Sequence, residues 1–202
     1  MAHIPRPTIA FLSPVELLSV LRVAKDRGAR DWVILLVAYL HACRASELCN
    51  FTLDDLNMRA GSIQVRRLKG SLDTTQPLYP HRGEPLMDEV RALRMWLKVR
   101  PRDGSAFLFP VQLFNSQKGG RLSRSQAFRI LQQCAKGAGI SDDRSFVHIL
   151  KHSRASHLVG KMDVALVKQT IGHKALSSTM VYAHVRDEDA AKEARRVTMQ
   201  IF

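Results

Sequence analysis

The stretch from residue 146 to residue 184 decides the fold of this chain. It reads F-V-H-I-L-K-H-S-R-A-S-H-L-V-G at 146–160, I-G-H-K at 171–174 and V-Y-A-H at 181–184. Five of the eight histidines lie in it: His148, His152, His157, His173 and His184. Together with the lysines of this stretch and Tyr182, they form a set of side chains that can hold and attack a phosphodiester.

The net charge of +13 is the most informative bulk property of this 202-residue chain. A charge of this size favours a polyanionic partner, most often nucleic acid, although a basic protein without such a partner has the same composition. The apolar content of 46% is enough to bury a core, and the length fits one domain or two small ones.

The chain shows no membrane or secretion signal. No uninterrupted apolar run approaches the roughly 20 residues that a membrane span needs, and the N-terminal M-A-H-I-P-R-P lacks the apolar segment of a signal peptide. The three cysteines, Cys43, Cys49 and Cys134, are odd in number and form no C-x-x-C pair. We therefore expect reduced thiols, a cytoplasmic location and no membrane partner.

Capping residues and hydrophobic periodicity predict a mainly helical chain. Ser13-Pro14-Val15-Glu16 has the order of a helix start, and Gly28 can end that helix. A second, deeply buried helix is expected from Trp32 to about Cys43, with Asp31 as its cap. The further helices that we expect begin near residues 46, 84 and 123, and then cover about 146–159, 163–171, 177–184 and 187–197.

The pattern changes period between residues 56 and 79. Residues 56–68 and 75–79 have the composition of short strands around the turn Lys69-Gly70-Ser71, with an earlier turn at Gly61. We therefore expect an α+β fold, mainly helical, in which a small antiparallel β-sheet packs on a helical body. One domain should span residues 1–202, with a loose leader at 1–11.

Cleavage of a nucleic-acid backbone requires a nucleophile, stabilisation of charge on two non-bridging oxygens, and an acid for the leaving oxygen. A metal ion can supply the charge, but the sequence has no H-E-x-x-H and no paired Asp/Glu motif. His148 and His152 are four positions apart on a predicted helix, without an evident third ligand. Fixed cations are the other solution, so we expect neither a metal nor another cofactor.

Four separated blocks resemble the tyrosine recombinases, or phage-type integrases, over nearly the whole chain. H-A-C-R-A-S-E-L at 41–48 is similar to the family's G-x-R-x-S-E-L, and R-L-K-G at 67–70 is similar to its lysine-bearing hairpin. H-I-L-K-H-S at 148–153 is similar to H-x-L-R-H-[ST]. I-G-H-K and V-Y-A-H then place a tyrosine nine residues after a histidine, as the family pattern requires.

The resemblance implies a site-specific DNA recombinase that acts by transesterification, forms a 3′-phosphotyrosyl intermediate, releases a 5′-hydroxyl and uses no ATP. It implies six catalytic positions, which are Arg44, Lys69, His148, Lys151, His173 and Tyr182. Glu47 is expected to support the site by orienting Arg44. The expected contacts to double-stranded DNA are Arg66, Arg67, Arg121, Arg124, Arg154 and Lys174.

Each implied role suits the chemistry of its side chain. Arg44 can hold phosphate with a planar fork, Lys69 can protonate the leaving oxygen from a turn tip, and Tyr182 can attack phosphorus. His148 can donate to phosphate or relay the tyrosine proton, and His173 can donate to phosphate. Taken one at a time, each residue also has an ordinary structural interpretation, such as a helix-capping arginine, a solvated lysine or a core tyrosine.

The sequence departs from the family pattern at Lys151, where the family has its second arginine. Lysine keeps the charge but loses the fork, and one charge-assisted hydrogen bond is typically worth about 1.5–3 kcal/mol. An alternative is therefore a DNA-binding protein with the recombinase fold and impaired catalysis. A type IB topoisomerase shares the chemistry, but the recombinase blocks and the chain length disfavour it.

The ends of the chain carry two further expectations. The resemblance begins almost at residue 1, so we expect no N-terminal core-binding domain, as in the short recombinases that invert fimbrial promoter switches, although a piece of a longer recombinase gives the same pattern. Residues 187–202 are expected to form an exchange helix and tail that dock on a neighbouring protomer, or else fold back on their own domain. The family implies a tetramer on DNA, a monomer or weak dimer without it, and a gene of bacterial or mobile-element origin.

Overall fold

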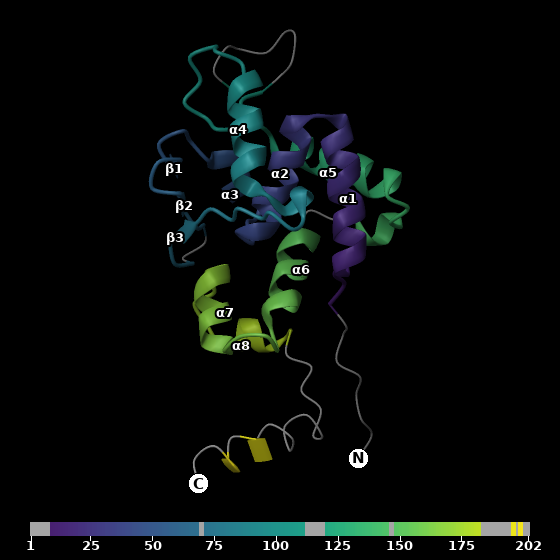
Figure 1. The fold of residues 1–202 in the computed structure, drawn as a ribbon, viewed down its shortest axis with the longest axis vertical. Helices are drawn as coiled ribbons and strands as arrows, with labels where there is room; N and C mark the ends of the chain where they lie inside the picture. The colour runs from purple at the N-terminus through teal and green to yellow at the C-terminus, as the bar shows by residue number, and fades with distance from the viewer. Residues whose placement is uncertain are drawn as a thin grey trace.

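The computed structural model describes residues 9–68, 71–111, 120–145, 148–182, 195, 196, 198 and 199. Lys69, most of the leader and almost all of the expected exchange segment lie outside these residues. Within them the chain is mainly helical with one small sheet, as predicted (Figure 1). The elements in chain order are α1 Pro14–Arg27, α2 Ala29–Leu40, α3 Ala45–Asn50, β1 Leu56–Asn57, β2 Ser62–Val65, β3 Thr74–Pro77, η1 Pro85–Met87, α4 Glu89–Val99, α5 Arg124–Gly137, η2 Asp142–Arg144, α6 Ile149–Leu158, α7 Val164–Ile171 and α8 Ser177–Met180.

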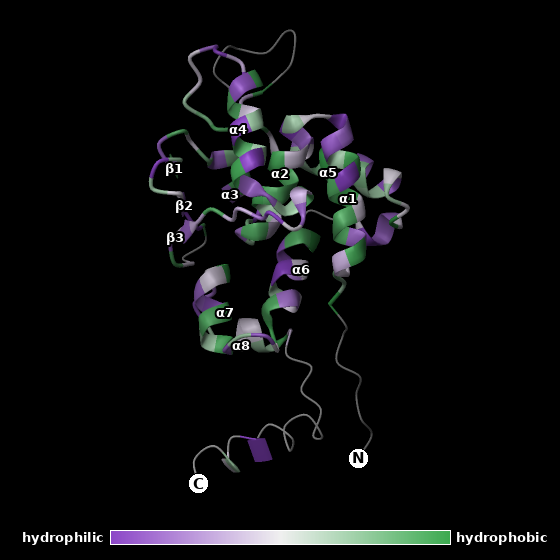
Figure 2. Cartoon of the chain, in the orientation of Figure 1, coloured by the Kyte–Doolittle hydropathy of each residue, from purple (hydrophilic) through white to green (hydrophobic). Residues whose placement is uncertain are grey.

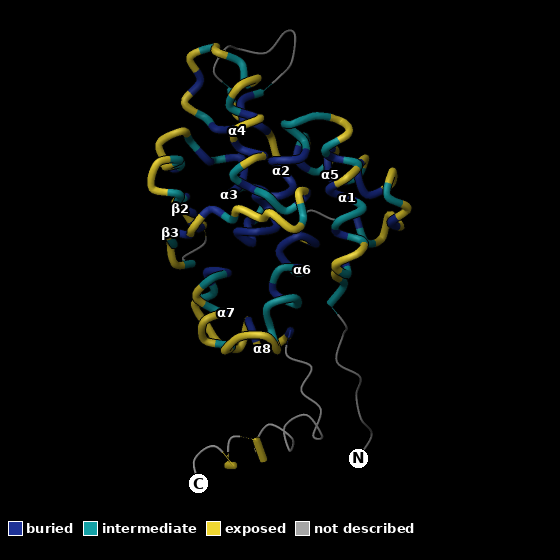
Figure 3. The backbone as a smooth tube through the Cα atoms, in the orientation of Figure 1, coloured by how far each residue is buried: buried dark blue, intermediate teal, exposed yellow. Residues whose placement is uncertain are grey.

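Helix α2 is the centre of the main core. Its residues from Trp32 to Leu40 are all buried, because α1, α4, α5 and α6 pack around it (Figure 3). After its first turn this helix is accordingly composed mainly of hydrophobic residues (Figure 2). The predicted cap is wrong: Gly28 precedes the helix, and Asp31 instead accepts a hydrogen bond from Arg27 at 2.9 Å.

The three strands form an antiparallel sheet in the order β1-β2-β3. Ile63 of β2 lies opposite Leu56 of β1 and Gln76 of β3, which fixes the register. Along β2 the side chains alternate, so that Ile63 and Val65 are buried in the core and Gln64 is exposed. The turn before β2 needs Gly61, whose φ of 66° is unfavourable for other residues.

Two predicted helix starts are confirmed by side chains that cap the helix. Ser13 and Ser123 form capping boxes with Glu16 and Gln126 at the starts of α1 and α5. The helix expected from residue 84 begins later, because residues 85–87 form a 3-10 turn and Asp88 caps α4 by accepting from the Arg91 amide.

Helices α6, α7 and α8 carry the decisive stretch and extend below the α1–α5 body (Figure 1). They enclose a second, smaller apolar cluster formed by Ala42, Ala155, Val167, Ile171 and Tyr182. Through Ala42 and Tyr182, this cluster connects the turn after α2 to the residues that follow α8. None of the described helices is long and apolar enough to cross a membrane.

Candidate active site

Arg44 stands at the start of α3, held by the carboxylate of Glu47. Its backbone amide donates to Glu47 Oε2 at 2.8 Å and its guanidinium donates to Glu47 Oε1 at 2.7 Å. A further bond runs from the guanidinium to Ser71 Oγ at 3.2 Å, and 25% of the Arg44 side chain remains exposed. Glu47 and Ser71 therefore both engage Nη1 of Arg44, and the side chain also lines a pocket.

Arg67 is a buried cross-link and not a surface cation. Its guanidinium donates to the carbonyl oxygens of His41, Ala42 and Thr170 at 2.9, 3.0 and 3.1 Å, and to Glu47 Oε2 at 3.2 Å. Its side chain has no exposed area. The prediction that Arg67 contacts DNA is wrong, because every described partner of its guanidinium lies inside the protein.

Glu47 is the shared anion of this buried network. Burial opposes its ionisation, but hydrogen bonds from Arg44 and the charge of Arg67 outweigh that penalty, so its pKa is lowered. The carboxylate thus stays charged and holds both arginines. Glu47 thus contacts Arg44, which it was expected to orient, and also Arg67, a second arginine that the sequence analysis did not connect with it.

Lys151 lies on α6 with only 5% of its surface exposed. Its Nζ donates to the carbonyl oxygen of Ile171 at 2.9 Å, at the end of α7. Burial, followed by the nearby charge of Arg67, lowers its pKa to about 8. The ammonium is therefore inside the site, but in the described state one of its three donors is used by the protein itself.

His173 follows Gly172, which ends α7 in a left-handed conformation with φ of 71°. Its Nδ1 lies 3.1 Å from Thr179 Oγ1 at α8. Burial, followed by the charges of Lys151 and Arg44, lowers its pKa to about 4. The imidazole is thus neutral at pH 7, and it can donate a hydrogen bond to phosphate only through its remaining N–H.

Tyr182 is buried, with 7% of its surface exposed, and its ring stacks on His173 with centroids 6.4 Å apart. Its hydroxyl lies 2.7 Å from Nδ1 of His152. Burial raises the pKa of Tyr182, and the charge of Arg44 opposes that rise. A neutral phenol at hydrogen-bond distance from a histidine needs a proton acceptor before it can act as a nucleophile.

His152 is a site residue that the sequence analysis did not assign. Its contact with Tyr182 arises because α7 and α8 turn back against α6, which no local pattern reveals. The only available signal was its position one helical turn after His148, which puts both histidines on one side of α6. Burial, followed by His148 and Lys151, lowers the pKa of His152.

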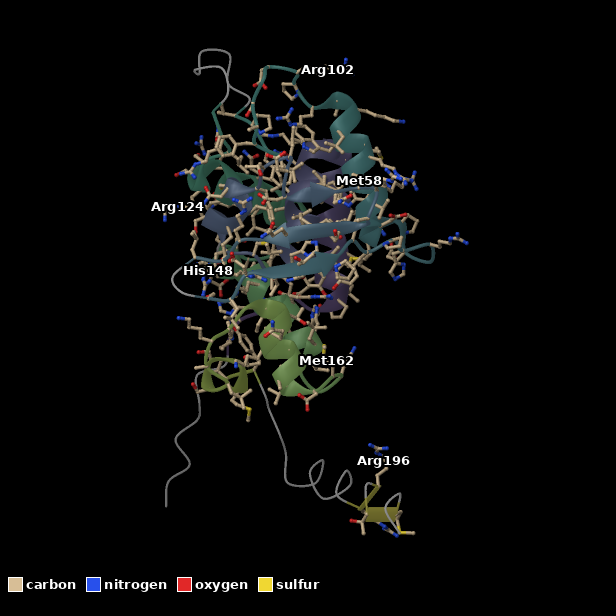
Figure 4. All side chains as sticks on the ribbon, turned by 90° about the vertical axis from the view of Figure 1, so that its left-hand side faces the viewer. Met58, Arg102, Arg124, His148, Met162 and Arg196 are labelled. Carbon is tan, nitrogen blue, oxygen red and sulfur yellow. The ribbon has the colours of Figure 1, made fainter. Side chains whose placement is uncertain are left out.

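His148 is exposed at the start of α6 and opens onto a pocket of about 530 Å³. The polar lining of this pocket comes from α3, α5 and α6, namely Arg44, Ser46, Arg124, Ser125, Arg129 and His148. Arg124 and His148 lie along the same edge of the molecule (Figure 4). The pocket therefore joins Arg44 to an exposed cationic surface.

A second pocket, of about 540 Å³, continues this surface past the N-terminus of α5 and is lined in part by Arg121 and Arg124. Arg121 is exposed and hydrogen-bonds Asn50, and Arg66 is exposed and pairs with Asp55 at 2.8 Å. Lys174 is also exposed. These positions are compatible with the predicted DNA contacts.

Arg154 was also expected to contact DNA, but this half-buried side chain is turned toward the core. Its guanidinium lies between the rings of Tyr39 and Tyr79, 5.4 Å from each centroid. Its Nε is buried. Arg154 therefore joins α6 to the α2 and β3 sides of the core.

Among the residues that the structure describes, no group of three or more histidines, cysteines, aspartates or glutamates could hold a metal ion. The described catalytic candidates Arg44, Lys151, His173 and Tyr182 come from different parts of the chain and influence one another electrostatically. Among the interactions that the structure describes, Glu47 is the carboxylate that pairs with Arg44, and it also acts electrostatically on Lys151.

The sequence profile of the Phage integrase family matches residues 10–189. The chain belongs to this family, the tyrosine recombinases. It is 33% identical over 178 residues to the type 1 fimbriae regulatory protein FimB of Escherichia coli K12, covering 85% of this chain and 82% of FimB. It is 29% identical over 197 residues to tyrosine recombinase XerA of Pyrococcus furiosus, covering 97% of this chain and 64% of XerA.

Solved structures of this family share the fold. A crystal structure of XerA recombinase superposes with a TM-score of 0.72 at 23% identity, covering 96% of this chain and 65% of that one. XerH bound to its difH substrate in a pre-cleavage complex gives 0.71 at 22% identity, covering 96% and 55%. The α+β fold prediction is thereby confirmed, and as a tyrosine recombinase the chain is a DNA strand transferase.

Proposed function

We propose that this protein is a site-specific recombinase that cuts and rejoins double-stranded DNA through a 3′-phosphotyrosyl intermediate, without metal or ATP. The observation that carries the proposal is the buried hydroxyl of Tyr182, which lies against His152 in a site that also contains Arg44, Lys151 and His173. This set supplies a nucleophile and fixed positive charge, the two requirements that a metal otherwise meets.

In the proposed reaction, Oη of Tyr182 forms a bond to phosphorus and the bond from phosphorus to the 5′-oxygen breaks. Arg44, Lys151 and His173 hold the non-bridging oxygens as charge grows on them. The 5′-oxygen takes a proton, from Lys69 as the family resemblance implies, and leaves as a hydroxyl. A 5′-hydroxyl of a second strand then reverses the step, so the bond energy is conserved.

The proposed partner is double-stranded DNA that lies along the two pockets beside α5. Arg124 and Arg129 line the first pocket next to Arg44, and Arg121 extends the surface beyond it. A recombinase of this fold has been solved on its difH substrate, and lambda integrase has been solved as a dimer on a core site. We extend the proposal to a tetramer on two duplexes at the bacterial nucleoid or on a mobile element, with residues 187–202 docking on a neighbouring protomer.

Lys151 supports one alternative, a DNA-binding protein with the recombinase fold and impaired catalysis. Its bond to the Ile171 carbonyl uses one of its donors, and an ammonium lacks the planar fork with which an arginine binds two oxygens. Under this alternative the cationic pockets bind DNA, but Tyr182 attacks phosphorus slowly or not at all.

Covalent capture separates the two functions. A pool of nicked duplexes with a randomised centre, labelled on the 5′ side of each nick, is incubated with the protein in a chelator. The recombinase proposal predicts a labelled band that survives denaturation and whose sequences can be recovered. Binding without any covalent band would favour the impaired-catalysis alternative, and a band that requires added magnesium would indicate a metal-dependent nuclease.

A further inference from the structure

Three histidines surround Tyr182 or the pocket beside it, and they are not equivalent. Nδ1 of His152 is 2.7 Å from the Tyr182 hydroxyl, and the two rings are tilted by 40° with centroids 5.8 Å apart. This is the heavy-atom distance at which a general base takes a proton. The contact involves the atom that must lose its proton when the tyrosine attacks.

The other two histidines are directed to different partners. His173 stacks on the tyrosine ring, and its Nδ1 engages Thr179 Oγ1. His148 lies one turn before His152 on α6, with ring planes 80° apart and centroids 6.4 Å apart, and it lines the pocket that contains Arg44 and Arg124. His148 thus faces the place that we propose for phosphate, and His152 faces the nucleophile.

We propose that His152, and not His148, accepts the proton of Tyr182 during DNA cleavage. This inference rests on the proposed function and specifies one step of it. The Oη–H proton of Tyr182 moves to Nδ1 of His152 as Oη bonds to phosphorus, which leaves an imidazolium beside a neutral phosphotyrosyl ester oxygen. In the rejoining step the same proton returns to Oη when the bond from phosphorus to the tyrosine breaks, so the cycle is balanced.

The surroundings of His152 suit a proton acceptor. Burial, together with His148 and Lys151 on the same helix, lowers its pKa, so the imidazole is neutral at pH 7 and has one unprotonated nitrogen. The other ionisable groups around the pair are His173 after α7 and Arg44 before α3, both of which influence this part of the site electrostatically.

The direct test compares His152→Asn with the wild-type protein. The asparagine amide has an oxygen that can replace Nδ1 as a hydrogen-bond acceptor, but it cannot take a proton at neutral pH. Single-turnover formation of the covalent adduct is measured from pH 6 to pH 9.5 on a nicked duplex recovered from the randomised pool. His148→Asn, one turn earlier on α6, is the matched variant, and DNA affinity is measured for each protein.

We expect His152→Asn to be about 100-fold slower at pH 7, because general-base catalysis typically contributes at least that factor. The deficit should shrink by about tenfold for each pH unit, since hydroxide then removes the proton, and DNA affinity should stay within about twofold. At each pH we take the ratio of the variant rate to the wild-type rate, because the effect of Lys151 ionisation on the rate is common to both proteins. His148→Asn should be slower by a factor that does not change with pH.

Several results would overturn the assignment. A wild-type rate in His152→Asn, or a deficit that stays constant with pH, would leave His152 with no role as a base. A pH-dependent deficit in His148→Asn instead would transfer the role to His148. If the wild-type protein itself forms no adduct with any member of the pool, the proposed function fails and this step fails with it, which is a distinguishable result.

A second measurement does not depend on cleavage or on folding of the His152 variant. In the ¹⁵N spectrum of the free wild-type protein at pH 7, Nδ1 of His152 should be unprotonated and should shift in Tyr182→Phe. A protonated Nδ1, or a signal that is indifferent to Tyr182→Phe, would overturn the inference. If His152→Asn does not fold, the same pH comparison is made with His152→Gln.

Discussion

The ammonium of Lys151 donates a hydrogen bond to the carbonyl oxygen of Ile171 over 2.9 Å. This bond ties α6 to the end of α7, two residues before His173, and it places the cation in a buried position. The family pattern has an arginine here, with two edges for binding. In this chain a single nitrogen must satisfy the α7 carbonyl and, in the proposed reaction, also stabilise phosphate.

DNA cleavage should depend on pH through the charge of Lys151. Burial lowers the pKa of Lys151 to about 8, so the charged form is lost as the pH rises through that value. The single-turnover rate of adduct formation should therefore fall above pH 8. Lys151→Arg should raise the rate at pH 7 by about tenfold and remove that fall, because arginine stays charged and offers a fork.

Lys151→Ala, made as a control, should be slower than the wild type at pH 7 and insensitive to pH near 8. An arginine variant that is slower than the wild type would mean that the pocket has been reshaped around lysine. If the lysine, arginine and alanine proteins are all equally inert with Tyr182 present, the impaired-catalysis alternative replaces the enzyme mechanism.

The same lysine should make stability depend on pH. Its folded-state pKa of about 8 lies below its ordinary value of 10.5, so between these values the unfolded chain binds more protons. The free energy of unfolding should therefore rise with pH, by about 2 kcal/mol between pH 7.5 and pH 9.5. Urea unfolding of the wild type and of Lys151→Met checks this, since the rise should be absent in the methionine variant.

Two adjacent arginines should behave in opposite ways. Arg67→Met leaves Glu47 without one of its buried partners and frees three carbonyl oxygens, so it should lower the free energy of unfolding by about 3–5 kcal/mol. Arg66→Met removes an exposed side chain that pairs with Asp55, and should cost less than about 1 kcal/mol.

For DNA binding, we expect the larger effect from Arg66→Met and the smaller effect from Arg67→Met. Arg66→Met should reduce the slope of log affinity against log salt by about 0.9, the value for one lost phosphate contact, while Arg67→Met should leave the slope unchanged. Urea unfolding and salt titrations on one duplex measure both quantities. An unchanged stability in Arg67→Met, together with a reduced slope, would restore Arg67 to the DNA surface.

Gly172, in the turn before His173, and Gly160, between α6 and α7, form a matched pair of glycines with positive φ. Gly172 has φ of 71°, and a Cβ added there would meet Arg67 Nε at 2.7 Å, whereas Gly160 has φ of 80° and open space around it. Gly160→Ala should cost about 1 kcal/mol from backbone strain alone. Gly172→Ala should cost about 1–3 kcal/mol more and should slow adduct formation, because it displaces the turn that carries His173.

Thermal unfolding and single-turnover kinetics distinguish these two substitutions. If the two alanine variants lose equal stability and equal rate, the contact between Arg67 and Gly172 has no special importance for the site. A rate loss confined to Gly172→Ala would support a role for Arg67 in positioning the end of α7, which it contacts at Thr170 and Gly172.

The sequence predicted the fold well where the signal was local. Ser13 and Ser123 carry capping boxes that mark helix starts, and Gly61 marks the turn into β2. The burial of Arg67 could also have been predicted from the sequence. Side chains alternate along an extended strand, which puts Arg67 on the same side as Ile63 and Val65. The charge of the R-R pair concealed that signal.

Other features required the tertiary structure. Arg154 sits among positively charged neighbours in sequence, but its environment is two tyrosines from distant segments. The contact between His152 and Tyr182 joins residues 30 positions apart and depends on how α7 and α8 pack. Such contacts are set by packing between elements, so periodicity and spacing give no sign of them.

The chemical identity of the residue attached to DNA distinguishes attack by Tyr182 from every other mechanism. Adduct formed in a chelator is digested with protease and nuclease, and the modified peptide is sequenced by mass spectrometry. We expect a phosphotyrosyl link to a 3′-phosphate at Tyr182, and no adduct from Tyr182→Phe despite nearly unchanged DNA binding. A link to Tyr39, Tyr79 or any other residue, or an adduct that persists in Tyr182→Phe, would contradict it.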